Sequence, residues 1–356
     1  MAIDYKINEV KIDLANYRHY IRGLPKIGKT RFFRDFIMEL YGDPKKGLLL
    51  SLGNESGFKA LGNITGQYCP TWYDFVEVID DLVENKESND FKFVCIDTVD
   101  RSFEIAEKRV LDIHRSVKGE PAFSIDAALG GFSKGKNKAK VLVEEQIARL
   151  ENAGYGMVFL GHTKTKQIGE QVGETVYEKV TGSLEFKYDA LYSDRADIIS
   201  MIVYESVAKN KELKDQKRVM YFRSTPEVDA GSRIGEEFFP EKIEYSAKGY
   251  IETVTKALEM AAGGKGKDAE NIRKKEEQER ELDAKKYVEK SKEEKYGSPE
   301  MTVEDYRSKL MQIAKSLSEE NAPLKKEELR KRNLPVAFST VDDIEVLKKI
   351  HAILVE

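Results

Sequence analysis

The residues with the most specific chemistry form the octapeptide GLPKIGKT, which runs from Gly23 to Thr30. It fits the pattern G-x-x-x-x-G-K-[ST] without a mismatch. Glycines let backbone N–H groups turn toward phosphate oxygens, the lysine supplies a point charge for the β- and γ-phosphates, and the threonine offers a hydroxyl to Mg²⁺. We therefore expect a site for ATP and Mg²⁺ whose phosphate-binding residues are Gly23, Leu24, Pro25, Lys26, Ile27, Gly28, Lys29, Thr30 and Arg31.

A phosphate-binding loop needs an acidic residue on a neighbouring strand to complete the magnesium shell. The segment FKFVCIDTVD supplies Asp97 at the end of the apolar run Phe93 to Ile96. Asp100 is the competing residue, but its position three residues farther on favours capping of a helix that begins near Arg101. The predicted metal ligands are therefore Thr30 and Asp97.

Hydrolysis also requires a side chain that orients water against the γ-phosphate. Glu55, in GLLLSLGNESG, follows the strand that comes after the first helix, and His162 lies at the polar end of the strand in FLGHTKTK. Taken alone, Glu55 is equally an ordinary loop acid, and His162 is equally a hydrogen-bonded histidine at a strand end. The candidate catalytic residues are Lys29, Glu55 and His162.

Short apolar runs alternate with segments of helical period up to about residue 205, a pattern typical of an α/β fold with a parallel sheet. Apolar spacing predicts helices at Lys29 to Tyr41 and Trp72 to Glu84. Two strands joined by a polar turn near residues 210–215 predict an antiparallel hairpin at the sheet edge, so the sheet is mixed. The expected inner strands are Tyr17 to Ile21, Gly47 to Leu52, Phe91 to Ile96, Met157 to Leu160 and Ile198 to Tyr204.

The last hundred residues differ in composition from the rest. A helix is expected from about Lys248 to Ala262, and residues 263–295 then have nearly balanced charge and no apolar stripe. This pattern is typical of a solvated helical or frayed spacer. Amphipathic spacing returns after Ser298, with two helices expected around Tyr306 and Ile344. We therefore predict an ATPase domain at 1–262, a charged linker at 263–297 and a small helical module at 298–356.

Composition excludes several classes of protein. The chain has 356 residues, of which 40% are hydrophobic and 34% charged, and no run of about 18 apolar residues suggests a membrane span. Cys69 and Cys95 cannot form a disulfide framework, and neither has the spacing of a zinc ligand. The net charge of −4 argues against nucleic-acid binding over the whole surface. A cytoplasmic protein without membrane partners is expected, in which any DNA contact is local.

The order of these motifs resembles the RecA-like ATPases: a phosphate-binding loop, SLGNES, VCIDT and then VFLGHTK. In the related AAA+ proteins a catalytic glutamate usually follows the Walker B aspartate directly, whereas here Thr98 does. PKIGKT, NES, HTK and the stretch Arg223 to Ile243 are similar to the phage nucleotide-binding ATPases that include the Sak-four single-strand annealing recombinases. The resemblance covers about residues 15 to 245. It implies that Glu55 activates water and that His162, where a glutamine is usual, couples the γ-phosphate to DNA-binding loops.

RecA-like recombinases contact DNA through two loops, and the resemblance assigns both. The first, Lys118 to Lys140, has five lysines against Glu120 and Asp126, a net charge of +3, interleaved with Phe123 and Phe132. Lysine and aromatic side chains together suit sequence-tolerant single-strand binding, although a solvated loop with two core aromatics is the plain alternative. The second loop, Lys164 to Lys187, has no net charge, and its assignment depends on its position after the strand that ends at His162. The predicted DNA-binding residues are Phe132, Lys134, Lys136, Lys138, Lys140, Lys164 and Lys166.

The sequence therefore predicts an ATP-dependent recombinase of phage origin, acting in the bacterial cytoplasm, that binds single-stranded DNA and promotes annealing or strand exchange. A homo-oligomer, ring or filament, is expected, with a single-strand-binding protein or replication partner at the C-terminal helices. Two other functions stay open: a helicase-like, terminase-like or loader motor, and a non-catalytic switch controlled by ATP. ATP-driven unwinding of a forked duplex would indicate the motor, whereas hydrolysis stimulated by single-stranded DNA would argue against the switch.

Overall fold

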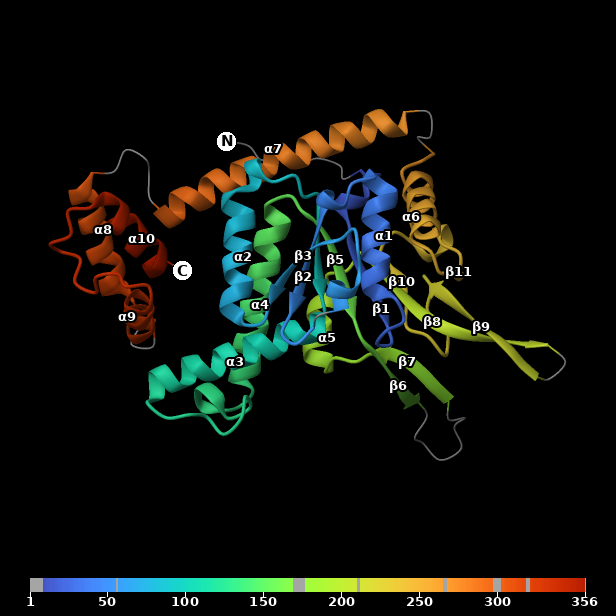
Figure 1. Cartoon of the computed structure of the whole chain (residues 1–356), viewed down its shortest axis with the longest axis horizontal. Helices are drawn as coiled ribbons and strands as arrows, with labels where there is room; N and C mark the ends of the chain where they lie inside the picture. Colours follow the sequence, from blue (N-terminus) through green and yellow to red (C-terminus); the bar gives the residue numbers. More distant parts are fainter. Residues whose placement is uncertain are drawn as a thin grey trace.

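The computed structural model describes residues 9–55, 57–168, 177–209, 212–264, 268–296, 302–317 and 321–355. Within these residues a nine-stranded sheet has the order β11-β9-β8-β1-β5-β4-β2-β3, and β10 pairs with β8 (Figure 1). The strands from β8 to β3 are parallel, while β9, β10 and β11 are antiparallel to their neighbours. The bounds are β1 Arg18–Gly23, β2 Gly47–Leu52, β3 Thr65–Cys69, β4 Phe93–Asp97, β5 Gly156–Gly161, β8 Ile198–Lys209, β9 Glu212–Tyr221, β10 Gly231–Ser232 and β11 Lys242–Glu244.

The predicted α/β class and mixed, mainly parallel sheet with an edge hairpin are confirmed. Strand β2 has the predicted bounds, and β1, β4 and β5 differ from prediction by one or two residues at their ends. The edge hairpin is β8–β9, but β8 runs to Lys209 instead of ending at Tyr204, and β9 already begins at Glu212, so the turn expected at 210–215 is too long. Residues 210 and 211 of that turn lie outside the described part of the chain. Sequence patterning missed β3, β10 and β11, which are short and lie at the sheet edges or off the main path.

Helices cover both faces of the sheet because successive strand side chains point to opposite sides. In β2, Leu48 and Leu50 join the core under one set of helices, whereas Leu49 joins the core on the other face. The first face carries α2, α3, α4 and α5, and the second carries α1 and α6 (Figure 1). Their bounds are α1 Lys29–Tyr41, α2 Trp72–Glu84, α3 Val99–Lys118, α4 Lys134–Asn152, α5 Phe186–Ser193 and α6 Ala247–Ala261, so α1 and α2 are confirmed as predicted.

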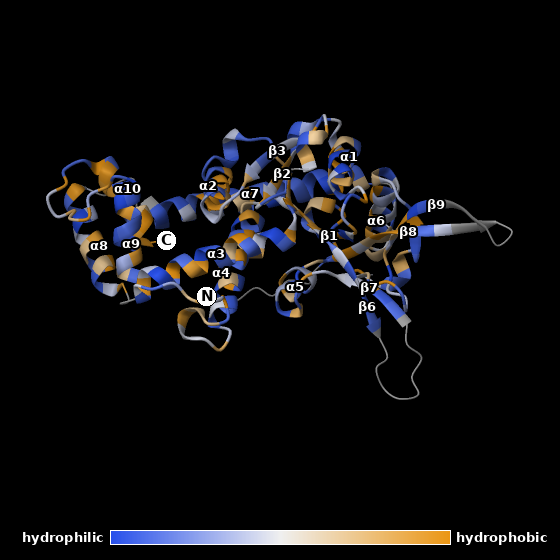
Figure 2. Ribbon diagram, turned by 60° about the horizontal axis from the view of Figure 1, so that its bottom comes forward, coloured by the Kyte–Doolittle hydropathy of each residue, from blue (hydrophilic) through white to orange (hydrophobic). Residues whose placement is uncertain are grey.

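A second, two-stranded sheet begins immediately after the central strand β5. Strands β6 (Thr163–Ile168) and β7 (Tyr177–Gly182) pair as an antiparallel hairpin that extends away from the body, as does β8–β9 (Figures 1 and 2). The segment expected to be a second loop is therefore largely this hairpin followed by α5. Glu170 and Glu174, which balance its charge, lie outside the described residues.

The charged segment is a helix, as expected, but it is not a solvated spacer. Helix α7 (Ala269–Tyr296) lies along the α/β body (Figure 1), with Ala284 and Val288 buried in the contact. Glu276, only 8% exposed, accepts hydrogen bonds from the backbone N–H groups of Ile12 and Asp13 at 2.8–3.0 Å. A polar face thus docks through hydrogen bonds and ion pairs, which an apolar-stripe test does not detect.

The C-terminal helices have a hydrophobic core of their own. Helices α8 (Val303–Ser316), α9 (Asn321–Lys331) and α10 (Ile344–Val355) enclose Tyr306, Leu310, Leu329, Leu347, Ile350, Ile353 and Leu354. Patterning predicted α8 and α10 but missed α9, whose sequence is mostly charged. In the described part of the chain, no helix has the combination of length and apolarity that a membrane crossing requires.

The docking of α7 can be tested with Glu276→Ala. This change leaves the Ile12 and Asp13 N–H groups without their carboxylate, so the free energy of unfolding should fall by about 2 kcal/mol. Chemical denaturation measures the loss. Glu279→Ala is the matched control, because that residue pairs only loosely with Lys275 at 3.9 Å on the exposed side of the helix. Equal effects of the two changes would contradict the docked arrangement.

Candidate functional site

The phosphate-binding loop connects the central strand β1 to the first turn of α1. A Cβ on Gly23 would lie 2.8 Å from the Ile27 side chain and 3.1 Å from the Ile202 carbonyl oxygen, so the strand can end here only with glycine. Gly28 is the N-cap of α1 and has φ of 115°, a backbone conformation that favours glycine. The loop therefore presents the amino end of a 13-residue helix, where N–H groups and the helix dipole attract anions.

Lys29 is almost fully buried and holds the loop together. Its Nζ donates to the carbonyl oxygens of Gly23 at 2.8 Å and Leu24 at 3.0 Å, and it lies 3.1 Å from Nδ1 of His162. Burial lowers the pKa of Lys29 to about 8, although the nearby Asp97 carboxylate opposes the shift. The ammonium is therefore still predominantly charged at neutral pH, as a phosphate-binding lysine must be.

Thr30 and Asp97 meet as predicted. The Thr30 hydroxyl donates to Oδ2 of Asp97 at 2.9 Å, and Asp97 is 4% exposed. Burial raises the pKa of Asp97 to about 6, while the Thr30 hydrogen bond acts in the opposite direction. A hydroxyl and a carboxylate are hard oxygen donors that fit Mg²⁺, which keeps waters and phosphate oxygens as its other ligands. Accordingly, the described residues contain no cluster of three His, Cys, Asp or Glu side chains that would form an all-protein metal site.

His162 and Glu55 lie on the same side of the loop. Strand β5 runs between β1 and β4, so its end places His162 beside the phosphate-binding loop, within 3.1 Å of Lys29. Nε2 of His162 is 3.6 Å from Oε1 of Glu55, which also lies 3.6 Å from Nε of Arg101. Burial, and secondly the charge of Lys29, lower the pKa of His162. The neutral ring then accepts from the Lys29 ammonium through Nδ1 and directs Nε2–H toward Glu55.

Asp100 does not cap α3, contrary to the expectation from its position. Thr98 occupies the N-cap, and Asp100 lies in the first turn. Its carboxylate accepts from the backbone N–H of His162 at 3.0 Å and from the Ser183 hydroxyl. The Ser183 N–H in turn donates to the His162 carbonyl at 3.0 Å. Asp100 therefore connects the root of the β6–β7 hairpin to the start of α3, directly after β4. Its partners are 62 and 83 residues away in the chain, so local patterning does not indicate them.

The lysines predicted to bind DNA occupy two different elements. Lys134, Lys136, Lys138 and Lys140 lie in the first two turns of α4 and not in a loop, while Lys164 and Lys166 lie on β6. Lys136 pairs with Asp126 at 3.4 Å and Glu185 at 3.1 Å. The ammonium of Lys164 donates to the Ser183 carbonyl at 2.7 Å. The ion pairs of Lys136 and the hydrogen bond of Lys164 hold the hairpin root and α5 against the body.

Three phenylalanines near these lysines are exposed, not core residues. The exposed fractions are 101% for Phe123, 96% for Phe132 and 89% for Phe186. Phe186 begins α5 directly after Glu185, the residue that pairs with Lys136. Sequence reasoning missed Phe186, because its only signal is an aromatic residue beside Lys187 in a polar stretch.

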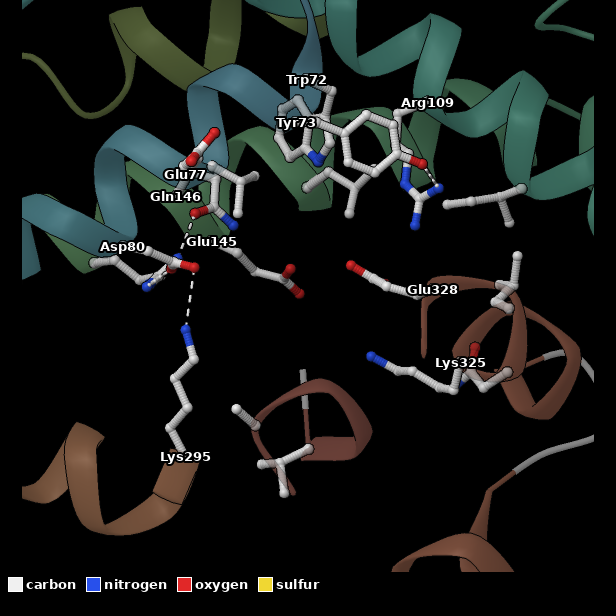
Figure 3. Close-up of a pocket in the computed structure, with 18 of the residues that line it drawn as sticks. Trp72, Tyr73, Glu77, Asp80, Arg109, Glu145, Gln146, Lys295, Lys325 and Glu328 are labelled. Carbon is white, nitrogen blue, oxygen red and sulfur yellow. Dashed lines mark hydrogen bonds and ion pairs between the residues drawn. The ribbon is translucent and has the colours of Figure 1, made fainter. Parts of the chain in front are cut away.

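A separate cavity of about 1190 Å³ lies between the ATPase body and the C-terminal helices (Figure 3). Lys295 of α7 reaches across it to Asp80 at 3.1 Å, and Arg109 donates to the Tyr73 hydroxyl at 2.6 Å on the body side. Lys138 also lines this cavity, while the residues around the phosphate-binding loop do not. The cavity therefore lies between two units that have separate apolar cores.

Comparison with known proteins identifies the core. A family model described as an AAA domain matches residues 15–234, more than half of the chain. The match contains Gly23–Arg31, Glu55, Asp97 and His162 together with both projecting hairpins. No curated protein matches the chain.

Asp100→Asn tests the connection between the nucleotide loop and the hairpin. Asp100 accepts from the His162 N–H and the Ser183 hydroxyl with its two carboxylate oxygens, whereas asparagine has one acceptor oxygen. One of the two hydrogen bonds is therefore lost, and the root of β6–β7 should open more often. We expect about ten-fold faster amide hydrogen exchange in β6 and β7, measured by mass spectrometry. Asp112→Asn, an exposed acid on the same helix, is the control and should leave these amides unchanged. Unchanged exchange in Asp100→Asn would contradict this role.

Proposed function

We propose a function on the premise that this chain belongs to the AAA domain family of P-loop ATPases: it hydrolyses ATP and couples nucleotide state to single-stranded DNA, promoting annealing or strand exchange. The observation that carries the proposal is that His162 contacts the ammonium of Lys29 and directly precedes Thr163, the first residue of β6 that pairs with β7, at the root of a projecting hairpin. A ligand at the loop therefore acts on the hairpin through one side chain.

The nucleotide half of the proposal follows from the geometry of the loop. Backbone N–H groups at the start of α1 and the Lys29 ammonium bind the β- and γ-phosphates, and Thr30 and Asp97 hold Mg²⁺. The metal neutralises charge that develops on the phosphate oxygens. Glu55, on the far side of His162, accepts a proton from the attacking water and orients it.

The coupling follows from the contacts of Lys29 with its own loop and with His162. To reach phosphate oxygens, its Nζ exchanges the carbonyls of Gly23 and Leu24, and Nδ1 of His162, for the ligand. The His162 ring then loses its charged donor and is free to contact the γ-phosphate. Because Asp100 and Ser183 bind the backbone on either side of His162, the root of β6–β7 moves with it.

The DNA half of the proposal rests on the exposed aromatic residues. Phe132 and Phe186 offer faces on which bases stack, and the exposed Lys134 and Lys166 supply charge for phosphates. We further propose that the protein acts as a homo-oligomer, ring or filament, in the cytoplasm of a phage-infected bacterium. In this proposal the C-terminal helices bind a single-strand-binding protein or another replication partner.

Two variants test the nucleotide site. Lys29→Ala should abolish binding of Mg-ATP, because the desolvated ammonium is replaced by a methyl group. Glu55→Gln should bind ATP normally but hydrolyse it about 10²–10⁴-fold more slowly, the usual contribution of a general base. Calorimetry and phosphate release measure the two effects. Glu104→Gln is the control, since Glu104 is the other carboxylate paired with Arg101 and should not be required. Normal hydrolysis in Glu55→Gln would show that this role is wrong.

Phe132→Ala and Phe186→Ala test the DNA surface. Each should weaken binding of single-stranded DNA about ten-fold, because base stacking on an aromatic ring contributes about 1–3 kcal/mol. Fluorescence anisotropy with a labelled oligonucleotide measures the affinity, and Leu282→Ala removes an exposed apolar side chain of α7 as the control. Affinity should also fall steeply with added salt. A flat salt profile would count against lysine–phosphate contacts, and ATP-driven unwinding of a forked duplex would favour the motor.

A further inference from the structure

Two side chains outside the phosphate-binding motif contact the loop from behind. Arg218 on β9 donates from Nη1 to the Ile27 carbonyl oxygen at 3.0 Å. Tyr245, which follows β11, donates its hydroxyl to the Gly28 carbonyl oxygen at 2.9 Å. The Arg218 guanidinium lies 4.3 Å from the centre of the Tyr245 ring, and the Tyr245 N–H donates to the Arg218 carbonyl at 3.0 Å. The two residues therefore form one unit that grips consecutive carbonyls.

The direction of these carbonyls fixes the direction of two amides. A trans peptide unit is planar, so its N–H points away from its C=O. The Ile27 carbonyl belongs to the same peptide unit as the Gly28 N–H, and the Gly28 carbonyl to the same unit as the Lys29 N–H. The contacts of Arg218 with the Ile27 oxygen and of Tyr245 with the Gly28 oxygen both favour N–H groups that face the opposite side, where we place the phosphates. The Gly28 oxygen also accepts the Phe32 N–H at 2.8 Å, the first hydrogen bond of α1, so Tyr245 reinforces a direction that the helix already favours. Gly28 is essential to this contact, because a Cβ there would lie 2.8 Å from Nη1 of Arg218 and 2.9 Å from the Tyr245 hydroxyl.

We propose that Arg218 and Tyr245 are positioning residues for nucleotide binding, which orient the Gly28 and Lys29 N–H groups toward the phosphates. The inference rests on the nucleotide site proposed above and adds the residues that preorganise it. Burial raises the pKa of Tyr245, so its hydroxyl remains a donor over the working pH range. The unit also belongs to the edge hairpin, since Arg218 is paired with Tyr204 across β8–β9.

A loop whose amides are no longer held should bind phosphates less well in the ground state and in the transition state alike. Such uniform loss raises KM and leaves kcat unchanged. In the full chain, Tyr245→Phe keeps the ring under Arg218 and removes only the hydroxyl. We expect its KM for ATP to rise about five-fold, and that of Arg218→Ala about ten-fold, with kcat within about two-fold. Arg218→Lys retains a charged donor and should recover part of the loss.

Tyr221→Phe is the matched control, because it too removes a tyrosine hydroxyl. The Tyr221 hydroxyl, at the end of β9, bonds to Glu205 and not to the loop. The KM of this variant should be that of the wild type. The melting temperature without nucleotide should not change in Tyr245→Phe, which separates positioning from a general loss of stability. An unchanged KM in Tyr245→Phe and Arg218→Ala, or a KM that rises only together with a lower melting temperature, would overturn the inference. Failure of the wild type itself to bind Mg-ATP would overturn the proposed function as well.

Discussion

The structure around the nucleotide loop depends on a charged ammonium that has been removed from water. Lys29 is 5% exposed, and its positive charge is satisfied by two carbonyls of its own loop and one imidazole nitrogen. Desolvation of a charge is costly unless such partners are present. The sheet order satisfies this requirement, because β5 lies next to β1 and its end brings His162 to the ammonium, while the nearby Asp97 carboxylate at the end of β4 favours the charged form. The need to provide the buried Lys29 ammonium with polar partners therefore links the strand order to the composition of the site.

Local chemistry accounts for what could be predicted from sequence. The predicted bounds of α1, α2 and β2 agree with the structure at every residue, because buried strands and amphipathic helices have periodic apolar residues. The loop could be located because GLPKIGKT has a fixed spacing. Thr30 and Asp97 were expected as ligands of one metal ion and do lie in contact, although β5 separates the strand of Asp97 from β1, so the two strands are not neighbours as expected. The roles of Glu55 and His162 stay predictions, although the structure places His162 beside Lys29 and Glu55 beside His162. Asp100, Phe186, Arg218 and Tyr245 could not be found in this way, because each acts through residues distant in the chain or through exposure that periodicity does not report.

The docking of the charged helix α7 also could not be predicted from the pattern of apolar residues. Its sequence has no apolar stripe, yet Glu276 and Arg280 bind the segment before β1, and Lys295 binds α2. Polar groups can dock a helix when each finds a specific partner, but their partners are invisible to a test that counts hydrophobic residues. Since this helix supports the segment that leads into β1, the C-terminal part of the chain contributes to the frame of the nucleotide site.

The cavity between the body and the C-terminal helices has a thermodynamic consequence. Among the described residues, the apolar core of α8, α9 and α10 stays separate from the two cores that sandwich the sheet, and the units meet through ion pairs and hydrogen bonds such as Ser116 with Glu327. Cooperative melting requires shared buried apolar surface. The two units should therefore unfold in separate calorimetric transitions. Heat or proteolysis can unfold or remove the C-terminal helices while the ATPase body stays folded and retains its own enthalpy of unfolding.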